Sequence, residues 1–83
     1  MRQVEFEHNG RRIGADLIRD HNAHGEIKGK VMVHIEGELV GLGQWVENET
    51  GCFIWCVHPQ NGLKSTGLSD DDYTALSDAL NRL

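Results

Sequence analysis

The chain of 83 residues is poor in several residue types, and these scarcities exclude several classes of protein. Aromatic residues make up 6%, and there are one proline and two cysteines. No segment approaches the roughly 18 consecutive apolar residues of a membrane span, and the acidic, alternating start is not typical of a signal peptide. Lys and Arg number 8 against 13 Asp and Glu, a net charge of −5, so the overall positive field of a strongly basic nucleic-acid-binding protein is missing. We expect one cytoplasmic domain, 1–83, without membrane contact.

The two cysteines, Cys52 and Cys56, predict neither a disulfide nor an enzyme. Four positions along a strand separate Cα atoms by roughly 13 Å, whereas a disulfide needs less than about 7 Å. On one strand face, Cys56 and His58 lie about 6–7 Å apart, too far for a nucleophile to be hydrogen-bonded to its base. We therefore expect no catalysis and no cofactor. A zinc site is the weakest alternative, because solvated histidines and a small apolar cysteine explain the pattern better; its ligands would be Cys56, His58, His21 and His24.

A β-hairpin is predicted for residues 1–18. Asn9-Gly10 favours a two-residue type I′ turn, because both turn positions need a positive φ. This turn pairs Phe6 with Ile13 and places their apolar side chains on one face of the hairpin. The remaining chain alternates between polar segments and apolar strands. Polar residues 19–29 predict a connecting loop, 30–58 a meander of three strands, and 59–68 a second loop that begins at Pro59.

A helix is predicted over 69–83. Ser69 is a good N-cap, and Asp72 stands where a capping-box partner belongs. An apolar stripe follows at helical spacing, formed by Tyr73, Leu76, Leu80 and Leu83. The expected fold is therefore α+β: a five-stranded antiparallel meander with one C-terminal helix packed on one face. A strongly bent, barrel-like sheet is the alternative, because Gly37, Gly41 and Gly43 permit bending.

The strands of 30–58 are apolar on both faces, which is the most informative pattern in the chain. The turn lengths place one set of side chains on a valine-rich face: Val31, Val33, Ile35, Val40, Leu42, Phe53, Trp55 and Val57. The opposite face then carries Met32, His34, Leu39, Trp45, Ile54, Cys56 and His58. One helix covers one face. The second face needs another cover: the first hairpin, a second copy of the chain or a different partner.

This second face predicts protein binding, because aromatic and methionine side chains are typical of interface centres. Acidic turns beside it would meet a basic groove of the partner. We expect a small non-catalytic binding module or homodimer, of the kind that phages and mobile elements encode as inhibitors of a larger enzyme or nucleoprotein complex. The predicted contact residues are Trp45, Met32, His34, Leu39, Ile54, His58, Glu36, Glu38, Glu47 and Glu49.

A homodimer that binds single-stranded nucleic acid is the alternative. Trp45 and His34 would stack on bases, and the phosphates would meet the basic residues of the first part of the chain, Arg11, Arg12, Arg19, Lys28 and Lys30. Dimeric single-strand binders with a curved four-stranded sheet and a helix are an analogy at the level of fold only. Five carboxylates in the same part of the chain neutralise much of this charge, so nucleic acid is the less favoured partner.

Overall fold

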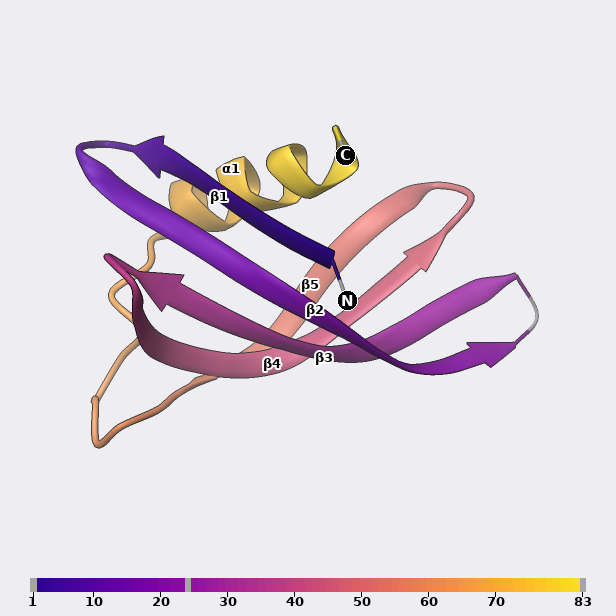
Figure 1. Ribbon diagram of the computed structural model, residues 1–83, viewed down its shortest axis with the longest axis horizontal. Helices are drawn as coiled ribbons and strands as arrows, with labels where there is room; N and C mark the ends of the chain where they lie inside the picture. The colour runs from indigo at the N-terminus through magenta and orange to yellow at the C-terminus, as the bar shows by residue number, and fades with distance from the viewer. Residues whose placement is uncertain (1, 24, 83) are drawn as a thin grey trace.

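The computed structural model describes residues 2–23 and 25–82, with side-chain surroundings for all of these except 21–23. Five strands form one antiparallel sheet in chain order. They are β1 (Arg2–His8), β2 (Arg11–Ala23), β3 (Glu26–Ile35), β4 (Glu38–Asn48) and β5 (Gly51–Pro59), and α1 (Asp70–Asn81) follows them (Figure 1). The sheet is open, with β1 and β5 at its edges. The predicted α+β meander with one C-terminal helix is confirmed. Within the described residues, no helix has the length and apolarity to cross a membrane.

The first hairpin has the predicted turn and pairing. Asn9 and Gly10 have φ values of 53° and 78°, as a type I′ turn requires. Phe6 pairs with Ile13, and Val4 pairs with Ala15.

The connection between β2 and β3 differs from the prediction. The expected loop over 19–29 is mostly strand, because β2 runs to Ala23 and β3 begins at Glu26. Polar side chains are tolerated here because Arg19 and Asp20 are exposed to solvent while their backbone belongs to the paired strands. A bulge between Arg19 and His21 leaves Asp20 as the extra residue of β2.

Two further bulges decide which side chains face the helix. Between β3 and β4, Val33 pairs with Gly41 and His34 with Leu39, so Val40 is an extra residue. Between β4 and β5, Gln44 pairs with Trp55 and Leu42 with His58, so β5 has one residue more than β4. Each extra residue inverts the alternation of faces beyond it. The predicted pairing of Gln44 with Trp55 is correct, whereas the predicted pairing of Leu42 with Val57 is wrong.

The inversion exchanges two groups of side chains. The inner face, which packs against α1, carries Val31, Val33, Val40, Trp45, Cys52, Ile54 and Val57. The outer face carries Met32, His34, Leu39, Leu42, Phe53, Trp55 and His58. The predicted faces were therefore wrong for Leu42, Trp45, Phe53, Ile54 and Trp55, all of which lie between the two bulges.

The helix closes the inner face by bridging the two edges of the sheet. It contacts β5, β1 and β2, and Leu76 and Leu80 are buried among the inner residues of the sheet. The predicted capping box is present, with Ser69 N donating to Asp72 at 2.9 Å and Asp72 N donating to Ser69 Oγ at 3.2 Å. Asn81, at the other end of α1, accepts from Cys52 N at 2.7 Å and donates to Cys52 O at 3.2 Å. Its side chain thus occupies the free edge of β5 as a neighbouring strand does.

Trp45 is a fixed part of this interior. Its side chain is 3% exposed, and Nε1 donates to the carbonyl of Ile18 at 3.0 Å. The indole crosses Gly29, its partner residue on β3; a Cβ at Gly29 would lie 2.8 Å from Nε1 and collide with the Ile18 carbonyl. The Arg2 guanidinium stacks over the ring at 5.2 Å from its centroid. Trp45 is therefore a core residue, although it also borders two hollows, one with Lys28 and Lys30 and one with Arg2 and Arg19.

Candidate binding surface

The outer side of β3, β4 and β5 is apolar and exposed. Three of the four large hydrophobic side chains that are exposed among the described residues lie here: Leu42 at 37%, Phe53 at 45% and Trp55 at 53%. Met32 and Val46 are half-buried beside them. We call this surface the aromatic face and define it by Met32, Leu42, Val46, Phe53 and Trp55. Apolar side chains gathered in this way mark contact sites more often than single exposed ones do.

Two lysines of β3 stand at the border of the aromatic face. Trp55 pairs with Gln44, which pairs with Lys30. Phe53 pairs with Val46, which pairs with Lys28. In each row, β5 and β3 are two inter-strand spacings apart. The backbone positions that carry the aromatic ring and the ammonium group are therefore about 10 Å apart. The face therefore has an aromatic edge along β5 and a basic edge along β3.

Shallow hollows lie on both sides of Lys30 and Gln44. One is lined by these two residues together with Lys28, Asp20 and Trp55. The other is lined by Lys30 and Gln44 together with Leu42, Cys56 and His58. The surface is thus uneven enough to hold side chains of a partner.

Carboxylates balance the lysines at this edge. Lys28 Nζ lies 3.6 Å from Glu26 Oε1, and Asp20 shares a hollow with Lys28 and Lys30. Two positive and two negative groups therefore stand together. The aromatic face is close to neutral, which differs from the positive groove that single-strand binding requires.

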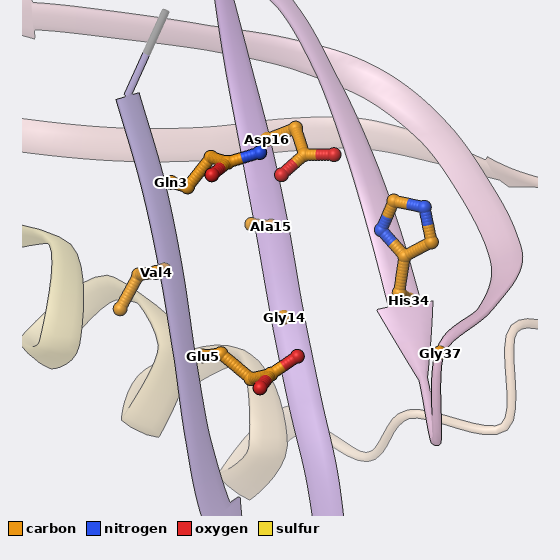
Figure 2. A pocket seen from close by; sticks show the side chains of 8 residues that line it. All are labelled: Gln3, Val4, Glu5, Gly14, Ala15, Asp16, His34 and Gly37. Atoms are coloured by element: carbon orange, nitrogen blue, oxygen red, sulfur yellow. The ribbon is translucent and has the colours of Figure 1, made fainter.

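The outer side of β1 and β2 has the opposite character. Glu5 and Glu7 on β1 are exposed, and Asp16 on β2 is half-buried. Figure 2 shows a hollow on this side, with Gln3, Glu5, Asp16 and His34 around Gly14, which has no side chain to fill it. We call this surface the acidic face and define it by Gln3, Glu5, Glu7, Gly14 and Asp16. The outer side of one sheet thus has an acidic half, in which Arg12 pairs with Glu7 and lies 3.8 Å from Glu5. Its other half is aromatic and close to neutral, because Glu26 and Asp20 balance Lys28 and Lys30.

The predicted contact residues divide between the two sides of the sheet. Met32, His34, Leu39 and His58 share the outer face, as predicted. Trp45 and Ile54 face the core instead. Sequence reasoning missed Leu42, Phe53 and Trp55 as surface residues. The alternation of side chains along the strands correctly predicted that Trp45 and Trp55 point to opposite sides of the sheet. The bulge at Val40 reversed which of the two faces the core.

The acidic turns do not border the aromatic face as a group. Glu36 and Glu38 stand at one end of β4, and Glu47 and Glu49 stand at its other end. Glu36 accepts from Arg12 N at 2.7 Å, and Glu47 pairs with Arg2 at 2.9 Å. These two carboxylates serve internal contacts, and the four acids stand as two pairs at opposite ends of β4.

The predicted basic patch is likewise divided. Arg11 donates to Gly67 O at 2.9 Å and to Asp72 at 2.6 Å. Arg12 lies 3.8 Å from Glu5, and Arg19 lines a hollow with Leu17 and Trp45. Only Lys28 and Lys30 of the five predicted basic residues lie beside the aromatic face.

The cysteines and histidines are not assembled into a site among the described residues. Cys52 is buried and Cys56 is exposed, and burial raises the pKa of the Cys52 thiol although Arg2 opposes the shift. Cys56 lines a hollow with His58, while the side chains of His21 and His24 fall outside the described part. The residues whose side chains the structure describes, 2–20 and 25–82, offer no group of three or more metal ligands.

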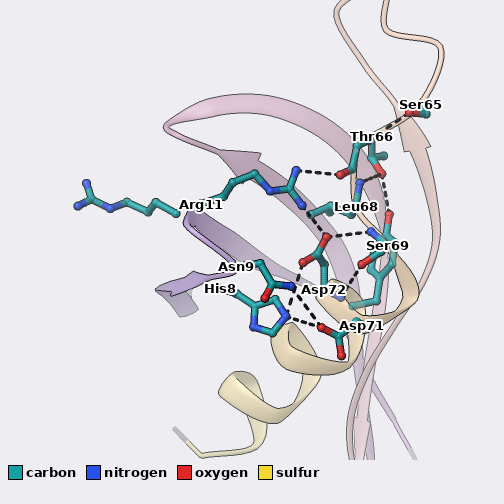
Figure 3. Close-up of polar contacts among 12 residues, drawn as sticks. His8, Asn9, Arg11, Ser65, Thr66, Leu68, Ser69, Asp71 and Asp72 are labelled. Carbon is teal, nitrogen blue, oxygen red and sulfur yellow. Dashed lines mark hydrogen bonds and ion pairs between the residues drawn. The ribbon is translucent and has the colours of Figure 1, made fainter.

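A polar cluster joins the first hairpin to the start of α1 (Figure 3). Asp72 is 2% exposed and accepts from Arg11, while His8 Nε2 lies 2.7 Å from Asp71 Oδ2 and 3.7 Å from Asp72 Oδ1. The backbone N–H of Ser69 is the largest influence that holds the pKa of Asp72 below its ordinary value, and Arg11 and His8 act in the same direction. This cluster fixes the helix over the inner face.

Comparison of the chain with protein-family models, curated proteins and solved structures finds no match. The two halves of the outer face are therefore the features from which function is inferred.

Proposed function

We propose that this protein is a non-catalytic protein-binding module and that the aromatic face is its contact surface. The observation that carries the proposal is the exposure of Phe53 and Trp55, two positions apart on one side of the edge strand β5. An exposed tryptophan and phenylalanine bring large apolar area with few rotatable bonds, and tryptophan is among the residues most enriched at binding hot spots.

The surroundings of these rings have the composition of an interface centre. Leu42, Met32 and Val46 supply apolar area, and Gln44 supplies an exposed amide among them. A polar rim follows, with Lys28, Lys30 and His58. This order, apolar at the centre and polar around it, is typical of protein contacts.

Charge favours a protein over single-stranded nucleic acid as the partner. The rings of Phe53 and Trp55 meet one requirement of a stacking platform. The second requirement is a positive track for the phosphates, and Glu26 and Asp20 oppose Lys28 and Lys30 at this place. A neutral apolar face with a mixed rim suits a protein surface better.

The test is site-specific photo-cross-linking in the native host cell. p-Benzoylphenylalanine is introduced in place of Trp55 in one variant and in place of Leu63 in another. Leu63 is the matched control, because it is as exposed as Phe53 (both 45%) but lies in the loop between β5 and α1. We expect one discrete protein adduct from position 55, identified by mass spectrometry, and no such adduct from position 63.

Equal adduct patterns from both positions, or no adduct from position 55, would exclude the aromatic face as a contact surface. An adduct at position 55 that carries nucleotides would replace the protein partner with nucleic acid.

A further inference from the structure

Building on the proposed function, we infer that the partner adds an extended segment to the sheet, alongside the edge strand β5. The backbone of this segment pairs with the backbone of Ile54. Its side chains lie alternately against the rings of Phe53 and Trp55 and in a hollow between β5 and α1. The segment is therefore apolar on both sides, and it carries a lysine or arginine that meets Asp70.

The alternation of hydrogen bonds along β5 directs the backbone of Ile54 to the free edge. Asn48 and Gly51 flank a two-residue turn and are partners across the ladder. In an antiparallel pair, residues that bond across the ladder alternate with residues whose N–H and C=O groups point away from it. Cys52 and Ile54 belong to the second kind. Asn81 confirms this at Cys52, because its side chain bonds both the N–H and the C=O group, at 2.7 and 3.2 Å.

Ile54 offers the next hydrogen-bonding position of this edge. Among the described residues, no group bonds to its N–H or C=O from the free side, and the residue is half-buried. Asn81 thus occupies the first position of a ladder whose second position is open. An unpaired donor and acceptor on an edge strand are what an extended chain satisfies, and added strands bind to sheet edges in this way.

A hollow lies next to this open position, between β5 and the first turn of α1. It is lined by Ile54, Trp55, Cys56 and Val57 from the strand and by Asp70 and Tyr73 from the helix. An added strand alternates its side chains in step with β5. Those on the inner side enter this hollow, and those on the outer side lie against Phe53 and Trp55, which are 45% and 53% exposed.

The lining of the hollow indicates the chemistry of the segment. Ile54, Val57 and the ring of Tyr73 give it apolar walls, which suit an apolar side chain. Among the described residues that line it, Asp70 alone is charged, and it is exposed. The neighbouring Asp71 is already paired with His8. A lysine or arginine of the segment would therefore pair with Asp70.

The first experiment selects a binding peptide and then observes the amide of Ile54. A displayed library of short random peptides is selected on the full chain, and the best binder is added to isotope-labelled protein. We expect hydrogen exchange of the Ile54 amide to slow about tenfold or more, because its N–H joins a ladder. The Glu5 amide is the control and should keep its rate, because the same alternation directs it to the free edge of β1.

The second experiment removes the donor at Ile54 and keeps every side chain. The full chain is synthesised with an ester in place of the amide N–H of Ile54, and circular dichroism checks that it folds. The selected peptide should bind about tenfold more weakly, the usual effect of losing one hydrogen bond. The same ester at Glu5 is the control and should leave the affinity unchanged.

The third experiment tests the charge of the segment. Asp70→Asn should weaken peptide binding about threefold at low salt, and the difference should disappear at high salt because the pair is exposed. Asp78→Asn, an exposed carboxylate of the same helix, should have no effect. Selected peptides without a basic residue, or an equal effect of the two substitutions, would overturn the assignment of Asp70.

The outcomes separate the added strand from the proposed function. A selection that enriches no peptide overturns the added strand. So does a bound peptide that leaves the exchange of the Ile54 amide unchanged, or one whose affinity ignores the ester at position 54. In each case a protein adduct at position 55 still supports the aromatic face as a contact surface. Loss of that adduct as well removes both.

Discussion

Trp45 and Trp55 stand ten positions apart on neighbouring strands and have opposite surroundings. Trp45 is 3% exposed, donates to the Ile18 carbonyl and lies under the Arg2 guanidinium. Trp55 is 53% exposed and projects from the edge strand β5. The inner side of the sheet has a helix to cover it, and the outer side has none within the described residues. A chain of this size can enclose one face of a five-stranded sheet, and the other must be polar or meet a partner.

The two tryptophans show how a single extra residue determines which side chain is buried in the core and which is exposed on the outer side. Trp45 pairs with Ile54, so the neighbour of Ile54, Trp55, must point to the opposite side. The bulge at Val40 decides which of the two points inward. Without it, Trp55 would face the helix and Trp45 would face outward.

The largest expected difference is in the free energy of unfolding of the two alanine variants. Trp45→Ala should lose about 3–5 kcal/mol, because it leaves a cavity among buried side chains, and it also frees the Ile18 carbonyl. Trp55→Ala should change stability by about 0.5 kcal/mol or less when measured at concentrations where the chain is monomeric. Urea denaturation followed by circular dichroism measures both. Similar losses for the two variants would contradict the assignment of Trp45 to the core and Trp55 to the surface.

Local patterns predicted most of the fold. The turn Asn9-Gly10 fixed the first hairpin, and Ser69 with Asp72 fixed the start of α1, because each signal acts through neighbouring backbone groups. The long hairpin of β2 and β3 escaped prediction. Its end is polar, so no apolar alternation in the sequence marks these residues as strand. The pairing of Asn22 with Ile27 and of Ala23 with Glu26 continues the antiparallel ladder of the sheet.

The candidate surface was only half predictable. Met32, His34, Leu39 and His58 were placed on one face correctly, because they lie outside the segment between the two bulges. The residues inside that segment were placed on the wrong sides. One signal was available in retrospect: Gly41 and Gly43 stand opposite the bulged part of β5, and a Cβ at either would lie 2.7 Å from a methyl group of Val57. Glycines that make room for a side chain of the next strand indicate irregular pairing.

Gly29→Ala tests whether the indole of Trp45 keeps its position because Gly29 has no side chain. The added methyl group would meet the Ile18 carbonyl and lie 2.8 Å from Trp45 Nε1, so β2 and β3 must separate or the indole must leave its hydrogen bond. We expect a loss of about 1–3 kcal/mol, the usual range for an overfilled core. Thermal unfolding and the fluorescence of Trp45 in a Trp55→Phe background report both effects.

The control for this variant is Lys30→Ala, at the next position of β3 on the outer side. It should leave the unfolding temperature and Trp45 fluorescence unchanged, because Lys30 is exposed and surface substitutions seldom matter to stability. Equal changes in unfolding temperature and Trp45 fluorescence for the two variants would contradict the assignment of Gly29 to the buried side of β3 and of Lys30 to its exposed side.

The smallest expected effect concerns the attachment of the helix that covers the inner side. Asp72→Asn should lower stability by about 1–2 kcal/mol at pH 7, because Arg11 and the Ser69 N–H lose a charged acceptor. The folded state lowers the pKa of Asp72. The charged carboxylate therefore stabilises the folded protein at pH values above the ordinary pKa of an aspartate in the unfolded chain, about 3.9. That contribution disappears as the pH falls through the lowered folded value.

The difference between wild type and Asp72→Asn should therefore be constant near neutrality and shrink below about pH 4. Urea denaturation across this range measures it, with Asp78→Asn, an exposed carboxylate of the same helix, as the control. A difference that grows in acid would contradict the lowered pKa.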